Sequence, residues 1–156
     1  MEDRFTRFSL AISEIYRYWH KIAGEEMEKY GLRGPHCIYL TAMSRFPDGA
    51  TATKLGEFCG KDKSDVSRMM AMMEKKGLVT RRSPNQNLYR GLYRLTEQGK
   101  EAAEFVRRRA QIAADLAGKD LTEEKRAVFY ECLESIAANI RTLSQKGLPE
   151  KHPGEE

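Results

Sequence analysis

Apolar residues recur every three or four positions over most of the chain, which predicts a mainly helical protein. The first stripe predicts one long helix with an apolar face, and it comprises Phe5, Phe8, Ile12, Ile15, Trp19 and Ile22. Gly31 and Gly34 interrupt that pattern, and Pro35 suits the first turn of a second helix. Two later stripes predict helices that begin after Thr96 and Thr122, and they comprise Ala103, Val106, Ala110, Ala113 and Ala117, and Phe129, Cys132, Ile136, Ile140 and Leu143.

The middle of the chain predicts two short helices joined by a turn. Residues 46–50 have the composition of a loop, and Thr51 is a plausible N-cap for a helix that buries Leu55, Phe58 and Cys59 and ends near Gly60. Asp62 or Ser64 can cap the next helix, which ends at Gly77. Its apolar face comprises Val66, Met69, Met70 and Met73. Its opposite face comprises Ser64, Arg68, Ala71 and Lys75, with Ser67 and Met72 on the flanks.

Two β-rich runs follow, 78–82 and 88–96, separated by polar residues that predict a hairpin. The expected fold is mainly α with a small β-hairpin wing, a winged helix-turn-helix flanked by N- and C-terminal dimerisation helices. The expected segments are 1–34 (dimerisation helix), 35–98 (winged helix), 99–146 (dimerisation helices) and 147–156 (flexible tail). A homodimer is expected because the outer helices expose more apolar surface than a small central domain covers. A monomeric bundle closed on itself is the alternative.

Composition describes a soluble globular chain whose charge is concentrated in the centre. The 156 residues carry a net charge of +4, with 40% hydrophobic and 32% charged residues. Segment 54–94 has ten basic and four acidic side chains, a net charge of +6, so the rest of the chain has −2. A basic centre on a neutral scaffold is typical of nucleic-acid binding, and a solvated charged surface is the alternative. No secretory signal or membrane span is visible, so a cytoplasmic location and no membrane partner are expected.

Motifs for catalysis or cofactor binding are missing from the sequence. The three histidines lie far apart and outside zinc-binding spacings, and no GxGxxG, Walker or GxSxG motif occurs. We therefore expect no enzyme activity, no cofactor and no metal. A metal site where His36 and Cys37 meet His20, and a weakly enzymatic or metal-buffering role, are the remote alternatives. Cys37, Cys59 and Cys132 form no CxxC pair and are expected to be reduced and mostly buried.

The middle of the chain resembles a known family. The runs KSDVSRMMAMMEKKGLVTRR and LYRLTEQGK are similar to the MarR-type winged-helix transcription regulators (multiple-antibiotic-resistance repressors), and PHCIYLTAM and TATKLGEFCG extend the similarity toward the N-terminus. The terminal helices match only in length and apolar stripe. The resemblance implies a homodimer with a winged helix in each half, bound to a pseudo-palindromic double-stranded DNA operator. It also implies a small phenolic or aromatic ligand between the dimerisation and DNA-binding parts.

A recognition helix with small polar residues and an arginine on its exposed face suits the major groove. The expected DNA-binding residues are Thr51, Lys63, Ser64, Asp65, Ser67, Arg68, Arg82, Asn85 and Arg90. One feature departs from the family: Asn87 and Tyr89 stand where its wing carries Asp-x-Arg, and Arg90 lies one place later. A one-residue shift in a strand turns a side chain to the other face. Arg82 or a rearranged wing tip is then expected to replace Arg90 in the minor groove.

Aromatic residues near the junction of the first two helices are the candidates for ligand binding. They comprise Tyr16, Trp19, His20, His36 and Tyr39, and ordinary core packing is the alternative reading of each. The expected function is a transcriptional regulator, most simply a repressor, that a small aromatic ligand releases from DNA. Two alternatives stay open: a winged helix that docks an acidic protein partner, and a redox-sensing regulator that uses Cys37.

Overall fold

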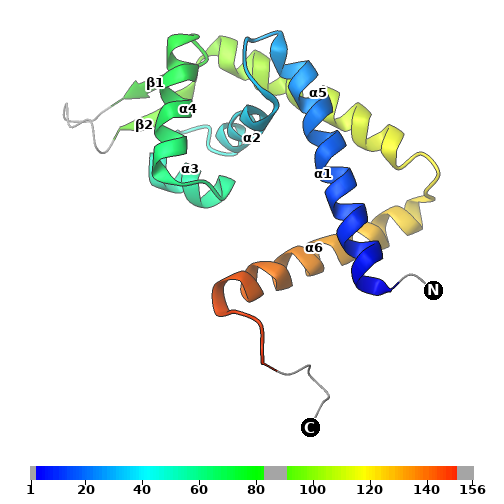
Figure 1. Cartoon of the computed structure of the whole chain (residues 1–156). Helices are drawn as coiled ribbons and strands as arrows, with labels where there is room; N and C mark the ends of the chain where they lie inside the picture. The colour runs from blue at the N-terminus through cyan, green and yellow to red at the C-terminus, as the bar shows by residue number, and fades with distance from the viewer. Residues whose placement is uncertain (1–2, 83–90, 151–156) are drawn as a thin grey trace. The chain divides into compact units, whose positions relative to one another are not determined.

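The computed structural model describes residues 3–82 and 91–150. In chain order its elements are α1 (Arg4–Glu28), the 3-10 turn η1 (Gly34–His36), α2 (Cys37–Ser44), α3 (Ala52–Cys59), α4 (Lys63–Lys75), β1 (Val79–Arg82), β2 (Leu92–Leu95), α5 (Glu97–Ala117) and α6 (Glu123–Lys146) (Figure 1). The expected fold class, mainly α with a β-hairpin wing, is confirmed. None of the helices in the described ranges is long and apolar enough to cross a membrane.

Short polar side chains set where the helices begin, as the sequence predicted. The Thr51 hydroxyl accepts the Lys54 N–H at 3.2 Å, and the Thr122 hydroxyl accepts the Lys125 N–H at 3.3 Å. Of the two candidate caps for α4, Asp62 is the one used, and its Oδ1 accepts the Asp65 N–H at 2.8 Å. Each bond satisfies a backbone donor that has no partner inside its own helix.

The core of the first compact unit, Met1–Ala113, lies between α2, α3, α4 and the start of α5. The apolar face of α4 is buried as expected from its spacing, and it comprises Val66, Met69, Met70 and Met73. The sequence predicted that Phe58 is buried, and this prediction is wrong, since 49% of Phe58 is exposed. It is exposed because position 58 lies on the outer side of a helix of only two turns. Its ring lies edge-on to the Phe46 ring, with centroids 5.6 Å apart.

The two strands form an antiparallel hairpin beside α4 (Figure 1). Val79 pairs with Leu95 and Arg82 pairs with Leu92, and Tyr93 is buried opposite Arg81. Tyr93 also exchanges two backbone hydrogen bonds with Ala50, of 3.0 and 2.9 Å. Residue 50 was expected to belong to a loop, but it forms a β-bridge with Tyr93. This bridge attaches the hairpin to the segment between α2 and α3.

The second compact unit, Ala114–Glu156, contains α6, a 24-residue helix without a buried residue. Its apolar stripe is at least partly exposed, as are the large apolar side chains of α1 from Phe5 to Ile22. Cys132 on α6 is exposed, so the expectation of a mostly buried thiol is wrong at this position, whereas Cys59 is buried. The functional segments predicted with boundaries at 34, 98 and 146 stay a prediction.

Candidate nucleic-acid interface

The outer face of α4 carries the side chains that were expected to read DNA. Lys63, Ser64, Ser67 and Arg68 are all exposed along its first two turns. The side chain of Arg68 is 73% accessible to solvent. The opposite face is fixed in the core, so α4 cannot rotate these residues away without exposing three methionines.

The turn between α3 and α4 holds the two helices close together. Gly60 adopts the left-handed conformation with φ of 63°, which ends α3. A Cβ on Gly56 would lie 2.9 Å from the Lys61 carbonyl oxygen, so the turn packs directly on the α3 backbone. Thr51 caps the other end of α3 and is half-buried, so its side chain supports that helix.

Asp65, one of the predicted DNA contacts, is only partly exposed and has partners within the protein. One carboxylate oxygen, Oδ2, accepts a hydrogen bond from the Tyr39 hydroxyl at 2.5 Å. The other, Oδ1, lies 3.5 Å from Nη2 of Arg68. A carboxylate is also repelled by phosphate. Both oxygens of Asp65 thus have partners within the protein, which link α4 to α2, and its contact with DNA stays a prediction.

Two of the predicted ligand-binding residues, His36 and Tyr39, are buried, and the Tyr39 hydroxyl reaches Asp65 of α4. Tyr39 is almost fully buried, and burial raises the pKa of its hydroxyl far above the ordinary value, with the hydrogen bond to Asp65 adding to the effect. The hydroxyl is therefore a permanent donor. His36 Nδ1 accepts the Arg33 N–H at 3.0 Å. Burial lowers the pKa of His36, although the charge of Asp65 opposes this shift.

The lowered pKa of His36 predicts a loss of stability in mild acid. Its ordinary value is 6.5, so as the pH falls below that value the unfolded chain binds this proton before the folded chain does. The stabilisation is thus complete above 6.5 and is lost as the pH falls through the lowered folded pKa. His36→Asn keeps an acceptor near Nδ1 but cannot titrate. Urea unfolding at a series of pH values should show a shallower acid loss for this variant, and parallel curves would contradict the assignment.

The described part of the wing presents one arginine outward and holds another against the sheet. Arg82 is exposed at the end of β1. Arg81 lies over the Tyr93 ring, with its guanidinium carbon 5.3 Å from the ring centroid. Arg94 Nε donates to the Asp48 carbonyl at 2.6 Å, which fixes the loop before α3. Asn85 and Arg90, two of the expected DNA contacts, lie outside the described residues, as do Asn87 and Tyr89.

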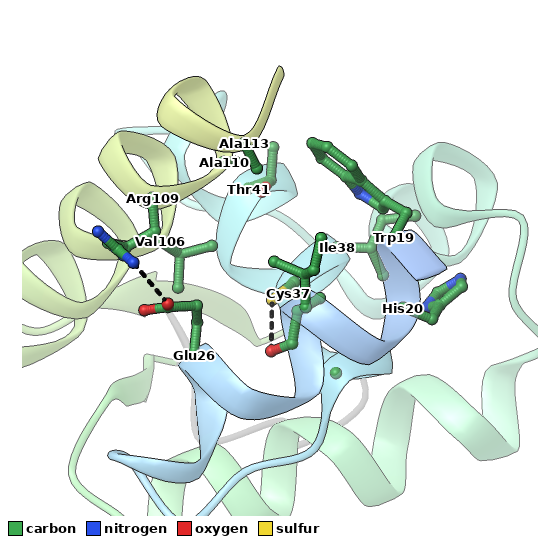
Figure 2. A pocket seen from close by; sticks show the side chains of 13 residues that line it. Trp19, His20, Glu26, Cys37, Ile38, Thr41, Val106, Arg109, Ala110 and Ala113 are labelled. Atoms are coloured by element: carbon green, nitrogen blue, oxygen red, sulfur yellow. Dashed lines mark hydrogen bonds and ion pairs between the residues drawn. The ribbon is translucent and has the colours of Figure 1, made fainter. Parts of the chain in front are cut away.

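A groove of about 440 Å³ lies between α1, α2 and α5, and we call it the α1–α2–α5 groove. Of the residues expected to bind a ligand, Trp19 and His20 line it (Figure 2). Tyr16 does not line it but packs against the His20 ring, with centroids 4.2 Å apart. His36 and Tyr39 do not line the groove, and the Tyr39 hydroxyl is bound to Asp65 of α4. Most of the remaining lining is apolar, and it comprises Ile22, Ala23, Gly34, Ile38, Thr41, Val106, Ala110 and Ala113.

An ion pair at the edge of the groove was not found from the sequence. Glu26 Oε1 and Arg109 Nη2 are 3.0 Å apart. Figure 2 shows Glu26 on α1 and Arg109 on α5 pointing toward each other. The hydrogen bond raises the pKa of Arg109. No local pattern connects residues 83 positions apart. The stripe through Val106, Ala110 and Ala113 was visible in the sequence, however, and it marks the face of α5 that lines the groove.

Cys37 lies in the same groove, with Sγ 3.8 Å from the Ala23 carbonyl oxygen. Burial raises the pKa of its thiol to about 11, and the carboxylate of Glu26 adds to the effect. A thiol is a weak nucleophile toward oxidants until it ionises. Within residues 3–82 and 91–150, no group of three or more His, Cys, Asp or Glu side chains could hold a metal ion.

Comparisons with known proteins agree with the resemblance in the sequence. Residues 30–86 match the model of the MarR family. No curated protein matches the chain. A MarR transcriptional regulator from Methanosarcina mazei Go1 superposes with a TM-score of 0.80 at 22% identity, over 92% of this chain and 94% of its own.

Two further solved structures, each with its own ligand, share the fold. A MarR family transcriptional regulator from Listeria monocytogenes, complexed with 26mer DNA, has a TM-score of 0.76 at 24% identity, over 97% of this chain and 100% of its own. CouR from Rhodococcus jostii RHA1, bound to p-coumaroyl-CoA, has a TM-score of 0.74 at 18% identity, over 88% and 96%. At these identities the likeness establishes the fold of this chain.

Proposed function

Since the chain has the MarR winged-helix fold and residues 30–86 match the family's model, we propose that it is a transcriptional regulator that binds double-stranded DNA sequence-specifically as a homodimer. The observation that carries the proposal is the exposed face of α4, where Ser64, Ser67 and Arg68 project from a helix fixed by its core side. Repression from a pseudo-palindromic operator is the simplest action of such a dimer.

Each proposed contact follows from the chemistry of its side chain. Arg68 is long and planar enough to form two hydrogen bonds to a guanine edge, and Ser64 and Ser67 are short enough to let α4 approach the bases. Lys63 at the first turn of α4 and Arg82 on β1 suit phosphates on either side. Thr51 at the start of α3 is a further candidate for a phosphate. The net charge of +6 in segment 54–94 supplies the general attraction.

Dimerisation is supported by large apolar side chains that are exposed in the single chain. Large hydrophobic residues on α1 and α6 are exposed over several turns of each helix. Rows of exposed apolar side chains along a helix are typical of interaction surfaces. A twofold dimer would place its half-sites about one helical turn apart, roughly 34 Å along the DNA.

The α1–α2–α5 groove supports release by a small ligand with an aromatic or other apolar body. Its lining is mainly apolar, and the charges of Glu26 and Arg109 in it neutralise each other. A relative, CouR, is bound to p-coumaroyl-CoA, whose acyl part is aromatic. The redox alternative has less support, since the raised pKa of Cys37 keeps its thiol protonated.

The test is fluorescence anisotropy with DNA from upstream of the protein's own gene, against a scrambled duplex, over a salt series. Specific binding should show at least ~10³-fold preference for the upstream DNA and a steep negative salt slope. Salt-dependent binding without preference would refute base reading on this DNA. Loss of binding even at low salt would favour the alternative in which the basic face docks an acidic protein.

Arg68→Ala is expected to weaken binding to the preferred DNA by about 1–3 kcal/mol and to reduce sequence preference at one position of each half-site. Lys75→Ala is the matched control, because it removes one positive charge from the last turn of the same helix. The control should weaken both duplexes to a similar, small extent. Equal losses on preferred and scrambled DNA for Arg68→Ala would refute its role in base reading.

A further inference from the structure

Arg68 is the outermost member of a chain of contacts that begins in the core. Only 1% of Tyr39 is exposed, yet its hydroxyl donates to Oδ2 of Asp65 at 2.5 Å. The second oxygen of the same carboxylate, Oδ1, faces Nη2 of Arg68 at 3.5 Å. Three residues on two helices thus connect the middle of α2 to the DNA-facing side of α4.

Both the backbone and the carboxylate of Asp65 have partners. The backbone N–H of Asp65 is bound by the side chain of Asp62, so the first turn of α4 is already fixed. An ionised carboxylate can only accept hydrogen bonds, and the Tyr39 hydroxyl can therefore only donate to it. Rotation of the Asp65 side chain would leave that buried hydroxyl without a partner, which proteins rarely tolerate.

We propose that Tyr39 is a positioning residue for DNA reading: its hydroxyl fixes the carboxylate of Asp65, and that carboxylate orients the guanidinium of Arg68 toward the bases. The proposal rests on the proposed function, because it requires that Arg68 reads a base. Tyr39 itself lies under α4 and touches no DNA.

The arrangement acts on selectivity more than on stability. The Arg68–Asp65 pair is exposed and long, and pairs of that kind contribute little to folding. A free arginine, however, samples many rotamers, and ordering it costs free energy that a pre-oriented side chain avoids on binding. A neighbouring carboxylate limits those rotamers before DNA arrives.

The test uses Tyr39→Phe, which removes one oxygen and keeps the ring in the core. The probe is a duplex selected from a random library by the wild-type protein, compared with a scrambled duplex. The preference for the selected duplex should fall roughly threefold to tenfold, as expected for one hydrogen bond, with scrambled binding and the salt slope unchanged. Tyr30→Phe is the control, because it removes a hydroxyl from a half-buried tyrosine elsewhere in the same unit.

A second comparison separates positioning from simple destabilisation. In an Arg68→Ala background, Tyr39→Phe should still lower Tm but should leave the remaining DNA preference unchanged. An equal loss of preference in both backgrounds, or full preference in Tyr39→Phe alone, would overturn the proposal. A wild-type protein that selects no duplex from the library would overturn the proposed function and this proposal together.

Discussion

Replacing Gly99 with alanine is expected to lower the free energy of unfolding by about 3 kcal/mol or more. The added Cβ would lie 1.9 Å from the carbonyl oxygen of Leu78 and 2.9 Å from its carbonyl carbon. That carbonyl accepts the Thr96 N–H at 3.1 Å, and the Thr96 hydroxyl both donates to Gly77 O at 2.6 Å and accepts the Gly99 N–H at 3.0 Å. The strand and the start of α5 are joined by these bonds, so neither can withdraw cheaply.

A glycine-to-alanine substitution in a helix usually raises stability, so a loss of stability at Gly99 would indicate the close contact with Leu78. Alanine is preferred over glycine in a helix interior by about 1 kcal/mol. Gly24 of α1 provides the matched control, because a Cβ there meets only an ordinary contact at 3.9 Å. Gly24→Ala should be neutral or stabilising in urea unfolding, whereas Gly99→Ala should be strongly destabilising. A Gly99→Ala variant within about 0.5 kcal/mol of wild type would refute the close approach of β1 and α5.

The helix-turn-helix could be predicted from sequence because its determinants are local. Caps such as Thr51 and Thr122 act on the backbone three residues away, and the face of α4 follows from helical spacing alone. Asp62 and Ser64 could not be separated as caps by type, since both residues are good acceptors. The prediction that Phe58 is buried was wrong, because α3 is too short for residue spacing to distinguish its inner side from its outer side.

The sequence predicted those parts of the candidate site that lie on a single helix. The exposed residues of α4 were found, but the partners of Asp65 and Arg109 were not, since Tyr39 and Glu26 lie 26 and 83 positions away. Helical spacing showed that Tyr39 belongs on α2 without showing which neighbour it faces. Its aromatic character predicts a ligand contact, which stays a prediction, and its hydrogen bond to Asp65 of α4 could not be foreseen. Such pairings depend on how the helices pack, which no local pattern encodes.

Ile136→Glu is expected to convert the proposed dimer to a monomer and to weaken operator binding by at least about 100-fold. Ile136 lies in the apolar stripe of α6 and is 39% exposed in one chain, so a glutamate there leaves the folded subunit intact. In a twofold interface the substitution occurs twice, and each carboxylate would be buried without a partner. Each monomer then contacts one half-site and loses the gain in affinity from simultaneous binding.

Ala138→Glu is the matched control, since it adds the same side chain to an exposed position on another side of α6. Light scattering should give a mass near twice 17.9 kDa for the wild type and the control, and near 17.9 kDa for Ile136→Glu. Unchanged helical content by circular dichroism would show that the subunit still folds. If Ile136→Glu keeps the dimer mass and full affinity, the stripe on α6 is not the dimer interface, and the exposed apolar residues of α1 become the place to seek it.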